Sequence, residues 1–253
     1  MVIRVMTYNI SGGRDNSALP VRFNMGVCCD VIKKCSPDIA GLNEVDKNVP
    51  RSECCDMPAE LKERAGNGCD AVFSKAIDLC GGEYGNMLLS KYRVLKSCTL
   101  PVPFPERMDE NRHYEKRSIL YAMIAAEDTN IEVLITHFGL SVEERKESVK
   151  KLTGLIKHRT NPLILMGDFN ASAESGELDL LYSLLNDTFQ QCSDRNAFTF
   201  PSRTDDEYKK YQSDTRCARI DHIFVSDEFT VNSAYIPEEC ASDHKPYVTE
   251  LSL

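Results

Sequence analysis

Short apolar runs along this chain alternate with stretches of helical spacing, and this pattern predicts an α/β protein. The runs that indicate buried strands are continuous and rich in β-branched residues. They cover residues 2–6, 38–42, 131–135, 162–166, 223–225 and 247–253. Further strands are expected over residues 71–79, 87–89 and 119–124, and Gly81 with Gly82 supplies a turn between the first two of these.

Helical periodicity fills the intervals between these runs. The apolar residues that recur at helical spacing before Pro37 are Phe23, Val27, Val31, Ile32 and Cys35. Ser141, with Glu144 three residues later, forms a capping box that opens another helix. Two more helices are expected over residues 59–65 and, from the spacing of leucines, over residues 178–185.

Each half of the chain repeats the order strand, helix, strand. This order indicates two sheets packed face to face, with helices outside. No linker divides the sequence, so we expect residues 1–253 to form a single domain. Two long polar insertions, at residues 101–117 and 203–219, are candidate lids or substrate loops, and both are read equally well as plain solvated connections.

The composition is that of a protein with a large core, because 42% of the 253 residues are hydrophobic. No run of about 18 apolar residues is found, so no membrane span is expected. The N-terminus enters a strand at once, without a charged segment followed by a cleavable apolar one. We therefore expect a cytoplasmic protein.

The chain has 11 cysteines, and their arrangement argues against a disulfide framework. The number is odd, two pairs are adjacent in sequence, and no C-x-x-C motif occurs. Reduced and mostly buried thiols are therefore expected. The alternative is a soft metal held by Cys54, Cys55, Cys69 and Cys80.

The net charge of −9 bears on the kind of partner. Proteins that grip the phosphates of long nucleic acid usually carry a basic face, and no tract of lysine and arginine is present. The chain also lacks Trp, which leaves no obvious stacking platform for bases. Nucleic acid is disfavoured but not excluded, because metal-dependent enzymes can carry acidic sites and still cleave it.

Short polar clusters stand beside the apolar runs and are the most informative feature for function. They are Thr7-Tyr8-Asn9, Asn43-Glu44, Thr136-His137, Gly167-Asp168-Phe169-Asn170, Asp221-His222 and Ser242-Asp243-His244. Because strand ends bring distant residues into one cleft, these clusters could form a single site. Hard oxygen ligands together with histidines suggest a divalent cation and proton transfer, which favours an enzyme.

In this order the clusters resemble the motifs of the endonuclease/exonuclease/phosphatase superfamily, which is DNase I-like and metal-dependent. The resemblance covers effectively the whole chain, and Gly-Asp-Phe-Asn followed by Ser-Asp-His is its most specific part. The superfamily includes nucleases, neutral sphingomyelinases, inositol-polyphosphate phosphatases and deadenylases. The resemblance implies a four-layer α/β/β/α sandwich of two packed mixed β-sheets flanked by helices.

The resemblance also implies a magnesium site. Glu44 is then the principal ligand, with Asn9 close by and Asp243 adding an oxygen near the metal. Mn²⁺ is expected to substitute for Mg²⁺, since both prefer oxygen donors. On local evidence alone, Glu44 is read as a surface carboxylate and Asn9 as a residue that bonds nearby backbone.

Catalytic roles follow from the same resemblance. Asp168 orients or deprotonates the attacking water, Asn170 bonds the phosphoryl oxygens as charge develops, and His137 contacts the phosphate. His244 pairs with Asp221, which fixes the imidazole tautomer and supports the imidazolium. Without the family match, Asp168 and Asn170 are read as turn residues and His137 as a core histidine.

Three further residues are candidates for substrate binding. Arg51 and Arg117 have guanidinium groups that can fork onto phosphate oxygens, and Asn86 resembles a position that faces the cleft in bacterial relatives. On local evidence each is read as a surface or turn residue. His222 follows Asp221 where many relatives carry an aromatic or apolar residue, so we expect a structural role for it.

The expected function is hydrolysis of a phosphate ester by in-line attack of water, with Mg²⁺ and the catalytic groups stabilising the phosphoryl charge. A small or lipid-derived phosphodiester is favoured, because the acidic charge disfavours long nucleic acid. A DNA or RNA endo- or exonuclease is the alternative within the enzyme class. A catalytically silent phosphate-binding protein on the same fold is the alternative outside it.

Overall fold

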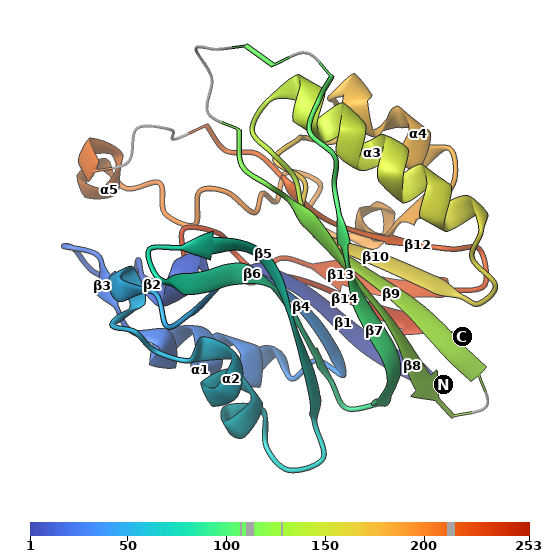
Figure 1. The fold of residues 1–253 in the computed structure, drawn as a ribbon, viewed down its shortest axis with the longest axis horizontal. Coiled ribbons are helices and arrows are strands. Elements are labelled where there is room, and N and C mark those ends of the chain that lie inside the picture. The colour runs from blue at the N-terminus through green and yellow to red at the C-terminus, as the bar shows by residue number, and fades with distance from the viewer. Residues whose placement is uncertain (107, 110–113, 128, 212–215) are drawn as a thin grey trace.

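Two six-stranded β-sheets pack face to face, with helices on both outer faces (Figure 1). The computed structural model describes residues 1–106, 108–109, 114–127, 129–211 and 216–253. The predicted insertions at residues 101–117 and 203–219 therefore lie partly outside the described residues. The predicted α/β/β/α sandwich is confirmed.

The first sheet consists of β1 (Val2–Asn9), β4 (Ile39–Lys47), β5 (Asp70–Leu79), β6 (Gly82–Ser90), β13 (Thr230–Tyr235) and β14 (Tyr247–Ser252). Its spatial order is β13-β14-β1-β4-β6-β5, in which β1 and β4 are parallel and the other neighbours antiparallel. The helices on its outer face are α1 (Met25–Cys35) and α2 (Met57–Ala65). β2 (Arg14–Asp15) and β3 (Arg22–Phe23) form a small separate ribbon.

The second sheet consists of β7 (Arg93–Pro101), β8 (Ser118–Ala126), β9 (Thr129–His137), β10 (Leu163–Asp168), β11 (Asn186–Asp187) and β12 (Asp221–Val225). Its spatial order is β11-β12-β10-β9-β8-β7, with β9 and β10 parallel. The helices on its outer face are α3 (Val142–Lys157) and α4 (Asp179–Tyr182), and α5 (Asp206–Tyr211) lies in the second insertion. The 3₁₀ turns among the described residues are η1 (Ser11–Gly13), η2 (Pro50–Ser52), η3 (Gly176–Leu178) and η4 (Thr188–Gln191).

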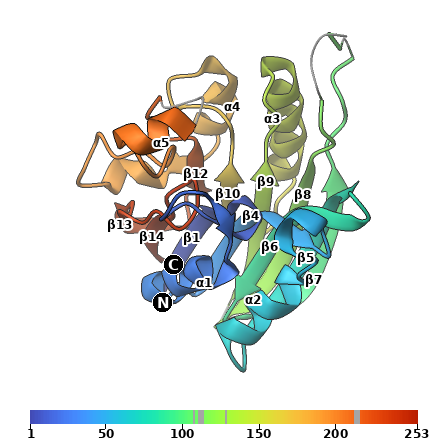
Figure 2. The same cartoon turned by 90° about the vertical axis from the view of Figure 1, so that its left-hand side faces the viewer.

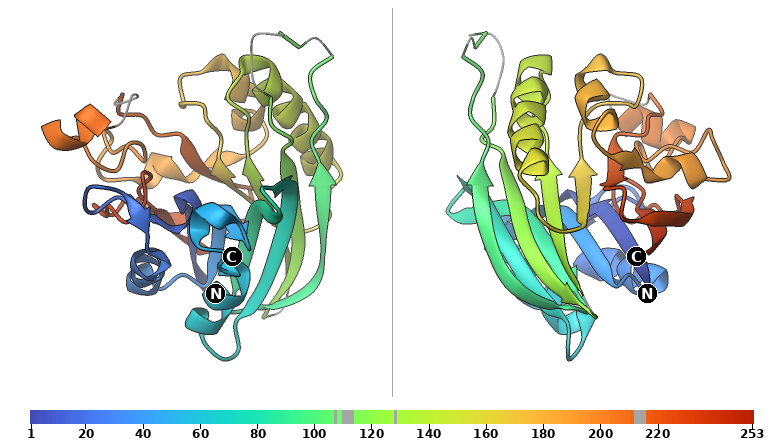
Figure 3. Two further views of the ribbon diagram at one scale, coloured as in Figure 1. Left: turned by 60° about the vertical axis from the view of Figure 1, so that its left-hand side comes forward. Right: turned by 90° about the vertical axis from the view of Figure 1, so that its right-hand side faces the viewer.

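Figure 2 shows the layers, with α1 and α2 on one side of the paired sheets and α3 and α4 on the other. The two chain termini lie side by side, because β1 pairs with β14 and Val2 stands opposite Ser252 (Figure 3). Both termini are thus at the opposite end of β1 from Asn9. No helix among the described residues is long and apolar enough to cross a membrane.

Continuous apolar runs form the central strands because both faces of each sheet are covered. Along β1, Val5 joins the cluster between the two sheets and Met6 joins the cluster beneath α1. Successive side chains of a strand point to opposite faces, so a strand that is buried on both faces reads as uniformly apolar. A third cluster, including Leu134, Leu152 and Leu165, fills the space beneath α3 and α4.

Strand register brings the polar clusters together at one end of the sandwich. In the first sheet Asn9 stands opposite Asn43 across the parallel pair β1 and β4. In the second sheet Asp168 stands opposite His137 on β9 and opposite Asp221 on β12. The carboxyl ends of both parallel pairs therefore supply Asn9, Asn43, His137 and Asp168, while Asp221 is the first residue of β12.

Glu44 lies on a β-bulge within a strand rather than beyond the end of one. β4 continues to Lys47, and its register against β6 shifts between Leu42 and Val45. Glu44 has a positive φ of 56°, as the extra residue of a bulge often does. The predicted strand ended at residue 42 because its apolar run ends there, whereas β6 pairs with β4 on both sides of the bulge.

The predicted helix over residues 178–185 is much shorter than the leucine spacing suggested. It consists of η3 followed by the single turn of α4, after which the chain turns toward β11. Leu178, Leu181 and Leu185 are buried in the cluster beneath α3. Their spacing therefore indicates that these leucines pack against one surface, and a short turn can place them there as well as a helix can.

β7 and β13 are absent from the sequence prediction because few of their residues are buried. β7 is mostly exposed, so its residues do not form the apolar run that marks a buried strand. Phe23 was assigned to the first helix, but it belongs to β3 and pairs with Arg14, and α1 begins at Met25. Tyr208 of the second insertion lies in α5 and is buried.

Gly167 is expected to be indispensable for stability. Its φ is +146°, and a Cβ atom there would lie 1.9 Å from the carbonyl oxygen of Thr136. Gly167→Ala should lower the free energy of unfolding by about 3 kcal/mol or more, measured by urea denaturation. Gly154→Ala is the matched control, since nothing lies within 4 Å of a Cβ on that exposed helical glycine. Equal stability of Gly167→Ala and the wild type would contradict the close approach of β10 to β9.

Candidate active site

The Asp168 carboxylate is the centre on which the predicted site residues converge. It is 1% exposed, and its Oδ2 lies 3.0 Å from Asn9 Nδ2, 3.5 Å from His137 Nε2 and 3.7 Å from His244 Nε2. Its Oδ1 accepts a hydrogen bond of 2.8 Å from the backbone N–H of Asn170. Residues from both sheets thus surround one carboxylate.

His244 forms a hydrogen bond with Asp221, the residue with which the family resemblance pairs it. Nδ1 of His244 lies 2.8 Å from Asp221 Oδ2, and both side chains are buried. Burial opposes the charged imidazole, but the carboxylates of Asp221 and Asp168 outweigh it and raise the pKa of His244 well above its usual value. His244 is therefore an imidazolium that donates from Nδ1 to Asp221 and presents Nε2–H to Asp168.

His137 is held in the opposite protonation state. The Arg117 guanidinium, which can only donate, lies 3.1 Å from His137 Nδ1, so this nitrogen accepts and the proton is on Nε2. The Tyr84 hydroxyl lies 3.4 Å from the same nitrogen. Burial and the positive charge of Arg117 hold the pKa of His137 well below its usual value. Asp168 is thus flanked by one neutral and one charged imidazole.

Glu44 and Asn9 meet at the junction of the bulge and the end of β1. The Asn9 amide nitrogen donates to Glu44 Oε1 at 3.1 Å, while its Oδ1 accepts from the backbone N–H of Ser11 at 3.0 Å. Asn9 therefore directs its nitrogen, not its oxygen, toward the carboxylates. Asp243 is half-buried on the loop before His244, with Oδ1 3.2 Å from the Ser242 hydroxyl.

The donor groups of the site fit a divalent cation. Burial raises the pKa of Glu44, and the nearby carboxylate of Asp243 acts in the same direction. A cation beside these two oxygens would remove their repulsion. Asp168, Asp221 and His244 also offer one donor atom each, and these atoms all lie within 4.8 Å of one another. The second group coincides with predicted catalytic residues rather than with the predicted ligands Asn9, Glu44 and Asp243.

The three predicted substrate-binding residues lie around the site in different settings. Arg51 is partly exposed and makes two hydrogen bonds of 2.8 Å to Asp46, with its guanidinium 5.4 Å from the centre of the Tyr84 ring. The Arg117 side chain is 9% exposed and lies beside His137. Asn86 is buried beneath the site, where its amide nitrogen donates to the Ser118 carbonyl.

The side chains of Asn170 and His222 each donate a hydrogen bond to a backbone carbonyl. Asn170 has a φ of +47° and its Nδ2 donates to the carbonyl of Phe138 at 2.9 Å. His222 is buried, donates from Nε2 to the Ala171 carbonyl and accepts at Nδ1 from Arg219. These bonds are those of a structural histidine, which is the role that its sequence position suggested.

Asn43, Tyr84 and Thr199 support the site but carried no predicted role. Asn43 stood in a recognised motif, yet only the structure reveals its bonds to the second sheet. Tyr84 contacts His137 from β6, and the Thr199 hydroxyl accepts from the backbone N–H of Asp221. Thr199 lies in a loop without regular periodicity, so no sequence pattern could have identified it.

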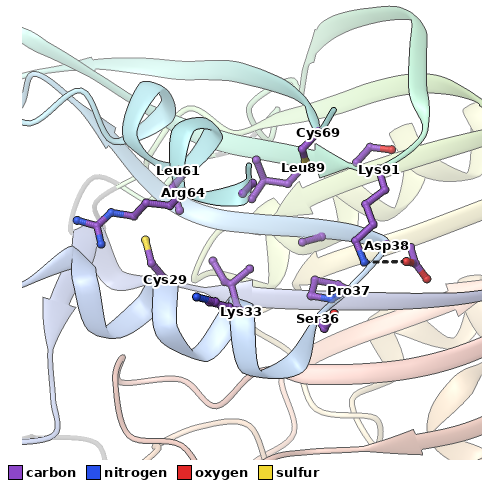
Figure 4. Close-up of a pocket in the computed structure, with 14 residues that line it drawn as sticks. Cys29, Lys33, Ser36, Pro37, Asp38, Leu61, Arg64, Cys69, Leu89 and Lys91 are labelled. Atoms are coloured by element: carbon purple, nitrogen blue, oxygen red, sulfur yellow. Dashed lines mark hydrogen bonds and ion pairs between the residues drawn. The ribbon is translucent and has the colours of Figure 1, made fainter. Parts of the chain in front are cut away.

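A pocket between α1 and α2 lies away from this site (Figure 4). It has a volume of 160 Å³, and Leu61 and Leu89 are among the residues that line it. Lys91 at its edge forms an ion pair of 3.0 Å with Asp38, at the opposite end of β4 from Glu44. None of the motif residues lines this pocket, so it is not the catalytic cleft.

The soft-metal alternative for the cysteines has little support in the structure. All 11 cysteines lie within the described residues and are free thiols. Among the described residues, the group of His, Cys, Asp or Glu donor atoms that lies close enough together to hold a metal is Asp168, Asp221 and His244, which contains no cysteine.

The second insertion packs onto the N-terminal loop. Arg203 donates to the carbonyl of Asn16 at 3.0 Å, and the Tyr208 hydroxyl donates to the side-chain oxygen of Asn16 at 3.3 Å. Just before the insertion, the Ser202 N–H donates to the Asp243 carbonyl at 2.7 Å. The segment that leads into the insertion therefore supports the loop that carries Asp243.

Comparison with solved structures agrees with the sandwich. An endonuclease/exonuclease/phosphatase from Beutenbergia cavernae DSM 12333 has a TM-score of 0.79 and 24% identity, covering 100% of this chain and 72% of that chain. A mannosyl-6-phosphatase from Bacteroides thetaiotaomicron VPI-5482 has a TM-score of 0.73 and 20% identity, and the match covers 99% of this chain and 100% of that chain. D. rerio TDP2 complexed with single-strand DNA product has a TM-score of 0.73 and 16% identity, and the match covers 100% of this chain and 99% of that chain.

At these identities the structures establish the fold alone, and the family is decided by sequence. No curated protein matches the chain. A model of the Endonuclease/Exonuclease/phosphatase family matches residues 6–244, which include every motif residue described above. With this match across nearly its whole length, the chain belongs to the endonuclease/exonuclease/phosphatase family.

Proposed function

We propose that this protein is a divalent-metal-dependent phosphodiesterase that hydrolyses a small or lipid-derived phosphodiester by in-line attack of water. The observation that carries the proposal is the surrounding of Asp168 by Asn9, His137 and His244. The Asp168 carboxylate supplies a base. The neutral imidazole of His137 and the imidazolium of His244 lie within 3.7 Å of its Oδ2 and supply a hydrogen-bond donor and a positive charge for phosphoryl transfer.

Each of these groups has a role that follows from its protonation state. Asp168 accepts a proton from the attacking water, and a pKa near 7 suits a base at neutral pH. The His244 imidazolium stabilises the negative charge that develops on the phosphoryl oxygens, and Asp221 keeps it charged and oriented. His137 donates a hydrogen bond from Nε2, and Asn170 lies at the adjacent loop to bond the same oxygens.

The cation is proposed to be Mg²⁺, with Mn²⁺ as a substitute. Glu44 and Asp243 would hold it through carboxylate oxygens, with Asn9 orienting Glu44 by its hydrogen bond. When bound, such an ion neutralises charge on the phosphoryl oxygens and lowers the pKa of coordinated water. We further propose a cytoplasmic location, which is compatible with the free thiols.

Two rival functions remain as alternatives. A nuclease uses the same groups, and the structure named for D. rerio TDP2 contains a single-strand DNA product on a similar fold. The net charge of −9 is the observation against long nucleic acid here. A silent phosphate-binding protein would not need Asp168, Glu44 and His244 together, and the chain contains all three.

The raised pKa of Asp168 should make stability depend on pH in metal-free protein. Burial raises this pKa from 3.8 to about 7, although His244 favours the charged form. The folded state then holds the proton more tightly than the unfolded state, so this stabilisation is lost as pH rises toward 7. The excess stability of the wild type over Asp168→Asn should fall by about 2 kcal/mol between about pH 5 and pH 7, measured by urea denaturation in EDTA. Asp187→Asn controls for loss of a buried carboxylate, and a difference that does not change with pH would refute the assignment.

Glu44→Gln should reduce metal-dependent turnover by about 100-fold while the fold survives, because it removes the charge of a proposed ligand. The rise in melting temperature on titration with Mg²⁺ should also be lost. The exposed neighbour Glu53 provides the matched control variant Glu53→Gln, which should behave like the wild type. Full turnover and unchanged Mg²⁺ stabilisation in Glu44→Gln would show that the ligand assignment is wrong.

Supercoiled plasmid with Mg²⁺ separates the favoured substrate class from the nuclease alternative. The proposal predicts no nicking by the wild type, because the acidic protein repels the phosphate backbone. His244→Ala, with its folding checked by circular dichroism, identifies contaminating activity. Metal-dependent nicking by the wild type that disappears in His244→Ala would establish the nuclease instead.

A further inference from the structure

Each of the two guanidinium groups beside the site faces a carboxylate of its own. Arg51 binds Asp46 through Nε and Nη2, both at 2.8 Å. Arg117 Nη1 lies 2.8 Å from Glu115 Oε1. Both pairs lie at the wall that includes Tyr84, whose ring lies against Arg51 and whose hydroxyl approaches His137. Neither guanidinium therefore brings an uncompensated positive charge to a bound phosphate.

Asp46 is built into the protein in a way that prevents Arg51 from leaving it. Its side chain is 0% exposed and belongs to β4, two residues after Glu44. Gly12 packs against it so closely that a Cβ there would lie 3.0 Å from Asp46 Oδ2. If Arg51 turned to a phosphate, a buried carboxylate would be left unpaired, which is strongly unfavourable. The pair is thus a fixed neutral unit at the edge of the site.

The rest of the site is rich in negative charge. Glu44, Asp168, Asp221 and Asp243 are carboxylates, and His244 is the imidazolium among them. A phosphodiester carries one negative charge, whereas a phosphomonoester carries nearly two above its second pKa of about 6. With the proposed divalent cation bound, the four carboxylates still outnumber the positive charges of that ion and of His244 by one. Each extra negative charge on the substrate therefore meets this surplus without relief from Arg51 or Arg117.

We propose that Asp46 and Glu115 are specificity-determining residues, which neutralise Arg51 and Arg117 so that the phosphate subsite takes a diester monoanion in preference to a monoester dianion. This inference rests on the proposed phosphoesterase function and names the charge class of its substrate. Asp46 carries the larger part, because it is fully buried, whereas the Glu115 side chain is 30% exposed. Exposure screens a charge and weakens its effect.

The experiment compares methyl 4-nitrophenyl phosphate, a monoanion, with 4-nitrophenyl phosphate, a dianion at about pH 8. The two compounds share a leaving group and differ by one methyl group and one charge. In Asp46→Asn the amide keeps the shape of the side chain and an oxygen that accepts a hydrogen bond from Arg51. The negative charge is lost, so the positive charge of Arg51 is no longer compensated. The ratio of kcat/KM for the dianion to kcat/KM for the monoanion should rise about tenfold, because the uncompensated charge of Arg51 attracts the second negative charge of the dianion, and a tenfold change corresponds to about 1.4 kcal/mol.

Asp187→Asn is the matched control. Asp187 is also buried and binds a guanidinium, that of Arg219, at 2.8 Å, but it lies outside the phosphate subsite. The Asp187→Asn variant should leave the ratio of the two kcat/KM values unchanged, although it removes a carboxylate from a similar pair. Glu115→Gln, at a partly exposed position, should raise the ratio by a smaller factor than Asp46→Asn. It provides a second test of the proposal if Asp46→Asn does not fold. An unchanged ratio in both Asp46→Asn and Glu115→Gln would overturn the proposal.

Binding of the same two compounds separates this inference from the proposed function. Thermal-shift titration in Mg²⁺ reports binding whether or not hydrolysis occurs. If the wild type binds the monoanion more tightly and hydrolyses neither compound, the proposed reaction fails and the charge inference stands. If the wild type binds the dianion more tightly, the charge inference fails, whatever the turnover.

Discussion

The site depends on one buried amide, that of Asn43, which joins the two sheets. Its Oδ1 accepts from the backbone N–H of Asp168 at 2.9 Å, and its Nδ2 donates to the Thr136 carbonyl at 2.9 Å and to Asn86 Oδ1 at 2.8 Å. It is fully buried, so every one of these bonds must be made. Asn43 therefore fixes the first sheet, which carries Glu44, against the second, which carries Asp168.

Burial then makes the electrostatics of the site specific. The side chains that meet in the site, those of Asp168, His137 and His244, are buried. In a buried position a neighbouring charge shifts a protonation equilibrium more than it would in water. Arg117 keeps one imidazole neutral, and Asp221 keeps the other charged. Two identical side chains thus acquire different chemistry because each has a different partner on its Nδ1.

Much of the site was predictable because its residues stand in short motifs beside apolar runs. The resemblance of these motifs to those of the family assigned roles to Glu44, Asp168 and His244, and the structure brings all three to one end of the sandwich. Asp46 and Glu115 lie only five and two residues from Arg51 and Arg117 in sequence, yet the sequence does not show that either pair forms, because pairing depends on burial and on the path of the backbone. No periodicity or motif marks either carboxylate, and sequence alone therefore suggested both arginines as phosphate ligands.

The sequence by itself determined the α/β character, the central strands and the set of motif residues. These follow from local patterns, since a strand covered on both faces must be apolar throughout and motif residues occur together along the chain. Only the tertiary structure decided the edge strands, the bulge at Glu44 and the protonation of His137 and His244. These depend on register, burial and long-range partners, which no local stretch of sequence contains.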